Sequence, residues 1–274
     1  AAQEARCLMK IISLNAWGGR LFEEMSRWLA DVQPDILCLQ EVVYAPGSPS
    51  AWLDYRDGDA VLPQRADVMR DVSQALPDHG VTFCPAACGN LWMGDREVPS
   101  LWGLATFLHP DLTIVGQAQG FVHGAFSPEG FGAHPRSRTG HVVRVWHPDE
   151  GGVTVGHMHG LRDPQGKMDT PVRGEQARKF AAMVQSVSMP GDPVVVCGDF
   201  NVLPGSETFR VLARIAPYNL VTSRAFDGTR TSHYKKDLKW ADYMLVNGPL
   251  KDASFDVLRE PEVSDHCALV LDTV

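Results

Sequence analysis

The sequence SDHCALVLD, residues 264–272, places an acidic residue and a histidine directly before a short apolar run. Residues 268–272 are apolar and β-forming, so they predict a strand. Polar residues stand at the start or end of an apolar run elsewhere in the chain as well. They are Asn15 (IISLN), Glu41 (ILCLQE), His157 and His159 (VTVGHMH), Asp199 and Asn201 (VVVCGDFN), and Asp242 (DYMLV). Carboxylates, amides and imidazoles at strand ends indicate an active site built on a sheet scaffold.

The order of the predicted elements indicates the fold class. Strands are predicted at residues 9–15, 36–40, 81–84, 103–108, 113–116, 141–146, 153–159, 194–197, 243–246, 253–257 and 268–272. Amphipathic helices are predicted at residues 21–31, 64–76, 175–187 and 206–215, the last with Ser206 as its N-cap. Strands that follow one another directly after residue 80 indicate antiparallel pairing and therefore mixed sheets. We expect an α/β fold in which two mixed β-sheets pack face to face with helices outside.

Long connections are the candidate substrate-binding regions. They are expected at residues 85–101, 121–139, 161–171 and 222–239, and they are rich in Gly, Pro, Trp, Arg and His. Loops of this length in a compact domain are usually functional. No internal repeat and no linker with a change of composition interrupts the chain, so a single domain over residues 1–274 is expected.

Composition narrows the class of protein. The chain has a net charge of −8 and is 44% hydrophobic. No apolar run approaches the ~20 residues that span a bilayer, and we expect no membrane partner. An acidic surface does not attract nucleic acid over a broad footprint, although a local basic groove remains compatible with it. Cys38, Cys197 and Cys267 lie inside apolar runs, as small buried thiols do, and no signal peptide is visible. A cytoplasmic monomer is expected.

The candidate site residues suit metal-assisted hydrolysis. The carboxylates and amides are hard oxygen donors, which favour Mg²⁺ or Mn²⁺. His266 follows Asp265, so the two side chains should point to opposite sides of an extended segment. Asp242, from a neighbouring strand, is the candidate for fixing the tautomer of His266. An Asp–His pair beside a divalent metal can activate water for in-line attack on phosphorus.

The motifs resemble those of the endonuclease/exonuclease/phosphatase superfamily, which includes pancreatic deoxyribonuclease, abasic-site endonucleases, bacterial sphingomyelinases, inositol-polyphosphate 5-phosphatases and deadenylases. The matching words, in the order of the family, are SLNAW (13–17), LCLQE (ending at residue 41), HMHG (157–160), GDFN (198–201), WADYMLV (240–246) and SDH (264–266). The resemblance implies a four-layer α/β sandwich of the deoxyribonuclease-I type.

The same resemblance implies a role for each matching residue. Glu41 would be the principal ligand of the metal, supported by Asn15 and Asp265. His266 would be the general base or would stabilise the phosphoryl group, oriented by Asp242.

Asp199 would position the nucleophile or protonate the leaving oxygen. Which of Asp199 and His266 is the base differs between proposals for the family, and both stay open here. Asn201 and His159 would hydrogen-bond the phosphoryl oxygens.

The candidate site and the resemblance imply that the substrate is a phosphate ester, either nucleic acid or a small molecule. The absence of a basic N-terminal extension and the acidic balance count against an abasic-site endonuclease, and the absence of a hydrophobic β-hairpin counts against a membrane-docking sphingomyelinase. A nuclease, a small phosphodiesterase and a phosphomonoesterase remain. The candidate substrate contacts are His157, Arg138, Arg162, Trp102 and His233. His157 shares a strand face with His159 and is either a second phosphate contact or a packed neighbour.

Two other classes of protein compete with this reading. A zinc hydrolase with an H-x-H-x-D-H motif would use His157 and His159, but the next positions of that motif are Leu161 and Arg162. A binding protein on a degenerate version of the fold would have lost site residues, whereas the matching set is complete.

Overall fold

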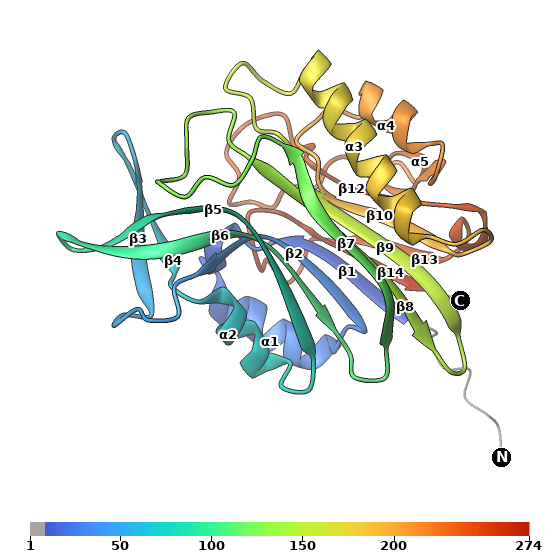
Figure 1. Cartoon of the computed structure of the whole chain (residues 1–274), viewed down its shortest axis with the longest axis horizontal. Coiled ribbons are helices and arrows are strands. Elements are labelled where there is room, and N and C mark those ends of the chain that lie inside the picture. Colours follow the sequence, from blue (N-terminus) through green and yellow to red (C-terminus); the bar gives the residue numbers. More distant parts are fainter. Residues whose placement is uncertain (1–8, 274) are drawn as a thin grey trace.

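Two β-sheets packed face to face form the centre of the structure, and helices cover their outer faces (Figure 1). The structure is a computed structural model that describes residues 9–273. The larger sheet has eight strands in the order β13-β14-β1-β2-β6-β5-β3-β4, and the smaller has six in the order β11-β12-β10-β9-β8-β7. Both sheets are mixed, since β1 pairs with β2 in parallel and with β14 antiparallel. The predicted four-layer α/β sandwich is confirmed.

The strands are β1 (Met9–Asn15), β2 (Ile36–Tyr44), β3 (Trp52–Asp57), β4 (Ala60–Arg65), β5 (Gly80–Met93), β6 (Arg96–Leu108), β7 (Thr113–His123), β8 (Arg138–His147), β9 (Gly151–His159), β10 (Val194–Asp199), β11 (Tyr218–Asn219), β12 (Asp242–Val246), β13 (Ser254–Leu258) and β14 (Ala268–Thr273). The helices are α1 (Phe22–Val32), α2 (Val68–Ala75), α3 (Pro171–Val187), α4 (Glu207–Leu212) and α5 (Leu220–Ser223), with short 3-10 turns η1 (Trp17–Gly19) and η2 (Gly248–Leu250).

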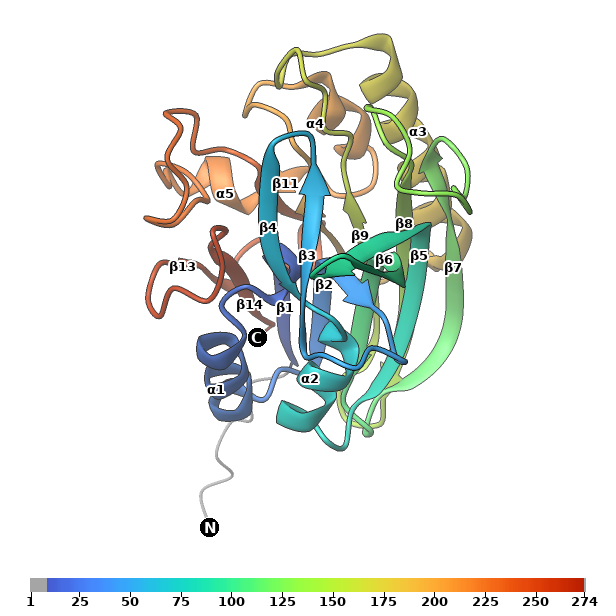
Figure 2. The same ribbon diagram turned by 90° about the vertical axis from the view of Figure 1, so that its left-hand side faces the viewer.

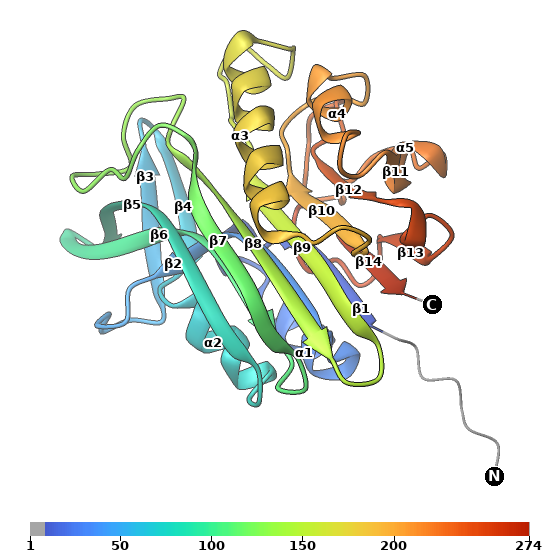
Figure 3. The same ribbon diagram turned by 45° about the vertical axis from the view of Figure 1, so that its right-hand side comes forward.

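The continuous apolar runs of the central strands reflect burial on both faces. Ile11 and Cys38 belong to the core between the two sheets, whereas Ile12 and Leu37 pack into the core beneath α1 and α2. Because side chains alternate along a strand, a strand covered on both sides must be apolar at every position. Helix α3 covers β7, β8 and β9 on the opposite face of the molecule (Figure 3).

Two hairpins depart from the sequence prediction. Residues 85–101, expected to be a loop, are the distal half of the hairpin β5–β6, which stays paired as far as Met93 and Arg96. The predicted helix 64–76 begins only at Val68, because Ala60–Arg65 pairs with β3 and Asp67 caps α2 by accepting from the Arg70 N–H. Figure 2 shows the β3–β4 hairpin standing in front of the sheets. The other three long connections are largely irregular, and Ser206 caps α4 as expected.

No helix within residues 9–273 combines the length and the apolar character that crossing a membrane requires.

Candidate active site

Three neighbouring strands of the smaller sheet bring acidic and imidazole groups to one sheet edge. The register pairs Asp199 with His159 on one side and with Asp242 on the other. Gly198 makes this close approach possible, since its φ is +130° and a Cβ there would lie 2.1 Å from the carbonyl oxygen of Met158. Only glycine tolerates both conditions.

The larger sheet supplies the other half of the site from β1, β2 and the segment before β14. Asn15 ends β1, and its carbonyl oxygen accepts a 2.6 Å hydrogen bond from the Ser264 hydroxyl. Glu41 lies at an irregularity of β2 with a φ of +55°. Trp17 and Asn201, at φ +51° and +54°, also line the pocket described below. Non-glycine residues rarely adopt this region, and such strain concentrates at functional sites.

His266 and Asp242 form a buried hydrogen-bonded pair. The Nδ1 atom of His266 lies 2.8 Å from Oδ2 of Asp242, which also accepts a 2.9 Å hydrogen bond from the Thr229 hydroxyl. Burial raises the pKa of Asp242 to about 7 and lowers the pKa of His266 to about 4, the latter helped by the positive charge of Arg230. His266 is therefore neutral at pH 7. With Nδ1–H donating to Asp242, the Nε2 lone pair is free to take a proton.

The remaining carboxylates surround the Nε2 side of His266. Asp199 Oδ2 and Asp265 Oδ1 each lie 3.7 Å from Nε2. Asp265 Oδ2 accepts a 2.7 Å hydrogen bond from Arg230, whereas its Oδ1 is buried without a hydrogen-bond partner among the described residues. Burial and, next to it, the charge of Asp265 together raise the pKa of Glu41 to about 7. Glu41 and Asp265 are thus close enough to repel one another, and one oxygen of Asp265 has no partner among the described residues.

Asn15 joins the two halves of the site as a hydrogen-bond donor. Its Nδ2 donates to Oδ2 of Asp199 at 3.0 Å, and its side chain also hydrogen-bonds Glu41. The amide oxygen accepts from the backbone N–H of Trp17 at 3.0 Å, which fixes the orientation of the amide. Asn15 therefore holds two carboxylates in place.

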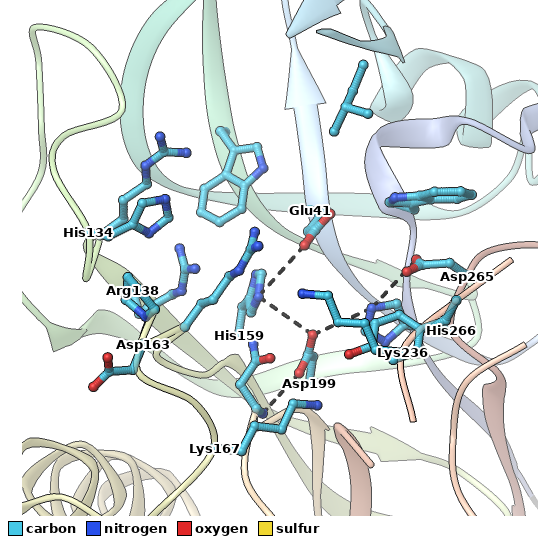
Figure 4. Close-up of a pocket in the computed structure, with 18 of the residues that line it drawn as sticks. Glu41, His134, Arg138, His159, Asp163, Lys167, Asp199, Lys236, Asp265 and His266 are labelled. Atoms are coloured by element: carbon cyan, nitrogen blue, oxygen red, sulfur yellow. Dashed lines mark hydrogen bonds and ion pairs between the residues drawn. The ribbon is translucent and has the colours of Figure 1, made fainter. Parts of the chain in front are cut away.

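His159, Asn201 and Arg138 lie on the opposite side of the carboxylates. His159 Nε2 lies 3.7 Å from Asp199 Oδ2 and 3.9 Å from Glu41 Oε1 (Figure 4). Asn201 Nδ2 donates to the carbonyl of Gly160 at 3.4 Å, and Arg138 Nε donates to the same carbonyl at 3.0 Å. Burial lowers the pKa of Arg138 to about 10, so it stays charged at neutral pH.

Glu41, Arg138, His159, Asp199, Asn201, Asp265 and His266 line one pocket of about 750 Å³. Asn15 and Asp242 do not line it but hydrogen-bond Asp199 and His266. Its basic lining side chains are Arg20, Arg136, Arg138, Arg162, Lys167, Arg173, Arg230 and Lys236. Its carboxylates are Glu41, Asp163, Asp199, Asp237 and Asp265. The pocket therefore carries a positive balance in a chain whose net charge is −8, as a site for anionic ligands requires.

One expected substrate contact is wrong. His157 is 1% exposed and lies between the two sheets, where its Nε2 is 2.8 Å from the Thr106 hydroxyl and its Nδ1 is 3.3 Å from Gln40 Nε2. Both ring nitrogens are thus used inside the protein, because the face that His157 shares with His159 is covered by the larger sheet at that depth. The zinc-hydrolase reading, which needs His157 and His159 as ligands of one ion, loses its support with it.

The other expected substrate contacts lie at or near the pocket. Arg138, Arg162 and Trp102 line it, and the Trp102 ring centroid is 5.4 Å from that of His159. His233 lies beside it, in a small depression that shares Trp17 and Arg20 with the main pocket. There it forms a 3.3 Å ion-pair contact with Glu262.

The 222–239 segment, expected to contact substrate, brings Arg230 and Lys236 to the pocket, where Arg230 holds Asp265 (Figure 4). Tyr55, which reaches the pocket from the β3–β4 hairpin, did not stand out in the sequence. A signal for the hairpin was present, because Asp57-Gly58 is a preferred two-residue hairpin turn.

Comparison with known proteins identifies the class. The model of the Endonuclease/Exonuclease/phosphatase family matches residues 12–266, and the chain belongs to that family. A search of curated proteins found no match. Similar solved structures include a mannosyl-6-phosphatase of Bacteroides thetaiotaomicron, which is 16% identical, with 97% of this chain and 99% of that chain covered and a TM-score of 0.63.

Two further structures illustrate the range of the fold. The human Nocturnin catalytic domain with bound sulfate is 17% identical, with 96% of this chain and 92% of that chain covered and a TM-score of 0.61. Truncated Caenorhabditis elegans TDP2 is 16% identical, with 96% of each chain covered and a TM-score of 0.60. At these identities the likeness concerns the fold alone.

Proposed function

We propose that the protein is a divalent-metal-dependent phosphoesterase that hydrolyses a phosphate ester by in-line attack of water. The observation that carries the proposal is the neutral His266, oriented by Asp242, with its free Nε2 facing Asp199 and Asp265 in a cationic pocket. A base, acidic metal ligands and phosphate-binding cations are the components that this reaction needs.

Glu41 and Asp265 would hold the metal, with Asn15 fixing Glu41. The unpartnered Oδ1 of Asp265 supports a cation here. The raised pKa of Glu41 supports it as well, because a cation would favour the ionised form that burial and the charge of Asp265 disfavour. Hard oxygen donors suit Mg²⁺ or Mn²⁺. When bound, the ion would polarise a phosphoryl oxygen and offset its developing charge.

Asp199, Asp242 and His266 also bring ligand atoms within 4.8 Å of one another. We favour Glu41 and Asp265, because His266 Nδ1 and both oxygens of Asp242 are already committed to each other.

His266 would take the proton of the attacking water, and Asp242 would keep the imidazole in the reactive tautomer. Asp199 would position the same water or protonate the leaving oxygen. His159, Asn201 and Arg138 would hydrogen-bond the phosphoryl oxygens as negative charge develops. All of these groups come from one chain, so a monomer would suffice for the reaction.

A metal-supplemented activity panel tests the proposal. Plasmid DNA, RNA, bis-p-nitrophenyl phosphate, p-nitrophenyl phosphate and inositol phosphates would be compared with Mg²⁺, with Mn²⁺ and with excess chelator, using the His266→Ala variant as the control. We expect metal-dependent release of product that the variant lacks. No turnover on any substrate would favour a binding protein instead, and equal turnover by wild type and variant would remove His266 from the mechanism.

A further inference from the structure

One side of the pocket carries positive charge that the proposed phosphoryl site does not use. In Figure 4, His134, Arg138 and Asp163 lie on one side, Asp265 and His266 lie on the other, and Glu41, His159 and Asp199 lie between them. Hydrolysis at one phosphorus atom needs the groups in the middle and on the His266 side. The basic residues beyond Arg138 therefore require another explanation.

Arg162 is the least compensated of these basic residues. It is exposed, it lines the pocket, and it makes no hydrogen bond or ion pair within residues 9–273. Its charge nevertheless acts on His134 nearby. Burial lowers the pKa of His134, and the charges of Arg136 and then Arg162 lower it further. A guanidinium fork with all of its donors free, next to two further basic groups, is suited to a phosphate or carboxylate.

Arg136 shows that this side of the pocket is a fixed wall. Its Nη1 donates to the Tyr55 hydroxyl at 2.6 Å, and its Nη2 donates to Asp57 at 3.3 Å. The Nε2 atom of His134 lies 3.6 Å from the same Asp57 carboxylate, and the ring centroids of Phe131 and Tyr55 are 5.8 Å apart. These contacts fasten the 124–137 loop to the β3–β4 hairpin.

The fastened wall limits the shape of the substrate. A nucleic-acid strand that continues on both sides of the scissile phosphate needs a groove that tracks its backbone. Here the loop and the hairpin meet across one end of the cleft, and basic groups stand at that end. A compact ligand with a charge at its far end fits this arrangement.

We propose that Arg162, with Arg136 and His134, forms a second anion-binding subsite, and that the substrate is a compact phosphate ester that carries a second phosphate or a carboxylate. The inference rests on the proposed function, because it assigns the scissile phosphate to the His266 side. Arg162 supplies most of the hydrogen bonds, and Arg136 supplies charge from a position fixed by the wall, with His134 beside it on the same carboxylate.

Anion binding measured by calorimetry in excess Mg²⁺ tests the subsite without a known substrate. The probes are methylphosphonate, α,ω-alkane bisphosphonates of increasing length, and ω-phosphonocarboxylates of the same lengths. We expect one length to bind about tenfold or more tightly than methylphosphonate, the gain of a charge-assisted interaction. The series that binds more tightly identifies the second group as a phosphate or a carboxylate.

Arg162→Gln should abolish this gain and leave the affinity for methylphosphonate unchanged. Arg70→Gln, which removes the same charge from an exposed position on α2, should keep the gain. Circular dichroism would check that both variants fold. Wild-type protein that binds no probe more tightly than methylphosphonate, or an Arg162→Gln variant that loses affinity equally for all probes, would overturn the subsite.

Hydrolysis of p-nitrophenyl phosphate, which lacks a second anionic group, reports separately on the proposed function. Turnover of that ester without a gain for the long probes would refute the subsite and leave the phosphoesterase standing. Tighter binding of the long probes without turnover of any ester would support the subsite and refute the phosphoesterase.

Discussion

The Nδ1 atom of His266 lies 2.8 Å from Oδ2 of Asp242, and the two residues come from opposite sheets of the sandwich. Asp242 begins β12 of the smaller sheet, and His266 immediately precedes the Cys267 that leads into β14 of the larger one. The pair therefore exists only when the two sheets are packed in register.

His266 and Asp242 should act as a unit. His266→Ala should lower turnover by roughly 10²–10⁴-fold, the usual contribution of general acid–base catalysis. Asp242→Asn should cost less, and the double variant should be little worse than His266→Ala alone, since a base and its orienting group are not additive. Steady-state kinetics on p-nitrophenyl esters would measure this. If the fold-losses in turnover of the two single variants multiply in the double variant, Asp199 becomes the better candidate for the base.

Glu41→Gln should weaken metal binding by more than the 10–100-fold typical of outer-shell changes, because it removes the charge of the principal proposed ligand. Titration with Mn²⁺ measures the affinity, and Glu23→Gln, an exposed change on α1, is the matched control. Unchanged affinity in Glu41→Gln would contradict the ligand assignment.

The same substitution should change the pH dependence of stability in excess chelator. The pKa of Glu41 is raised to about 7 in the folded protein, against a usual value of about 4.3 in unfolded chains. Folding therefore disfavours the ionised form, and the protein loses stability as the pH rises between these two values. Glu41→Gln should melt above wild type at pH 8 and level with it at pH 4, as seen by thermal denaturation. A variant that melts below wild type at pH 8 would mean that the carboxylate is compensated.

His141 should make the protein sensitive to acid. It is fully buried between the sheets, its Nδ1 lies 2.7 Å from the Thr106 hydroxyl, and its Nε2 has no partner among the described residues. Burial lowers its pKa to about 4, whereas the unfolded value is about 6.5. As the pH falls, His141 is protonated in the unfolded state before it is protonated in the folded state. The free energy of unfolding therefore keeps its full value above pH 6.5 and falls by about 3 kcal/mol towards pH 4.

Denaturant unfolding at pH 7.5 and pH 4.5 measures this loss. His141→Gln should show a smaller loss between the two conditions, and His123→Gln, on the half-buried outer strand β7, should keep the loss of the wild type. Equal losses in His141→Gln and wild type would assign the effect to other groups.

Gly198→Ala should destabilise the fold by about 2 kcal/mol or more, through backbone strain at positive φ and a clash with the Met158 carbonyl. Gly205→Ala is the control, because a Cβ at that glycine meets nothing within 4 Å. Chemical denaturation of both variants checks the difference. A Gly198→Ala protein as stable as Gly205→Ala would show that β9 and β10 can separate at this end.

The central strands could be predicted because burial on both faces makes them continuous apolar runs, as in β10. The distal half of β5–β6 could not be predicted from composition, since Pro85, Gly89 and Pro99 suggest a loop. The register of its partner strand fixes these residues instead, with a bulge between Pro85 and Ala87.

Most site motifs could be predicted because they stand at strand ends, as Asn15, His159, Asp199 and Asp242 do. Glu41 lies inside β2 instead, at its bulge. Whether a site residue is buried between the sheets or reaches the pocket could not be predicted in the same way. The period of β9 gives the shared face of His157 and His159, but only the packing of the second sheet decides that His157 is covered while His159 reaches the pocket. The pairing of Arg230 with Asp265 could not be predicted either, because the two residues are 35 positions apart in the chain.

The β3–β4 hairpin that closes the pocket is the terminal pair of the larger sheet, joined to it through β5. Strands at a sheet edge can lengthen, shorten or disappear without breaking any other pairing, so this hairpin can vary while β1, β2 and β14 keep Asn15, Glu41 and Asp265 in place. Evolution within such a scaffold can therefore exchange compact substrates for polymeric ones by altering residues 52–65 and the loop fastened to them, while the hydrolytic chemistry is inherited unchanged.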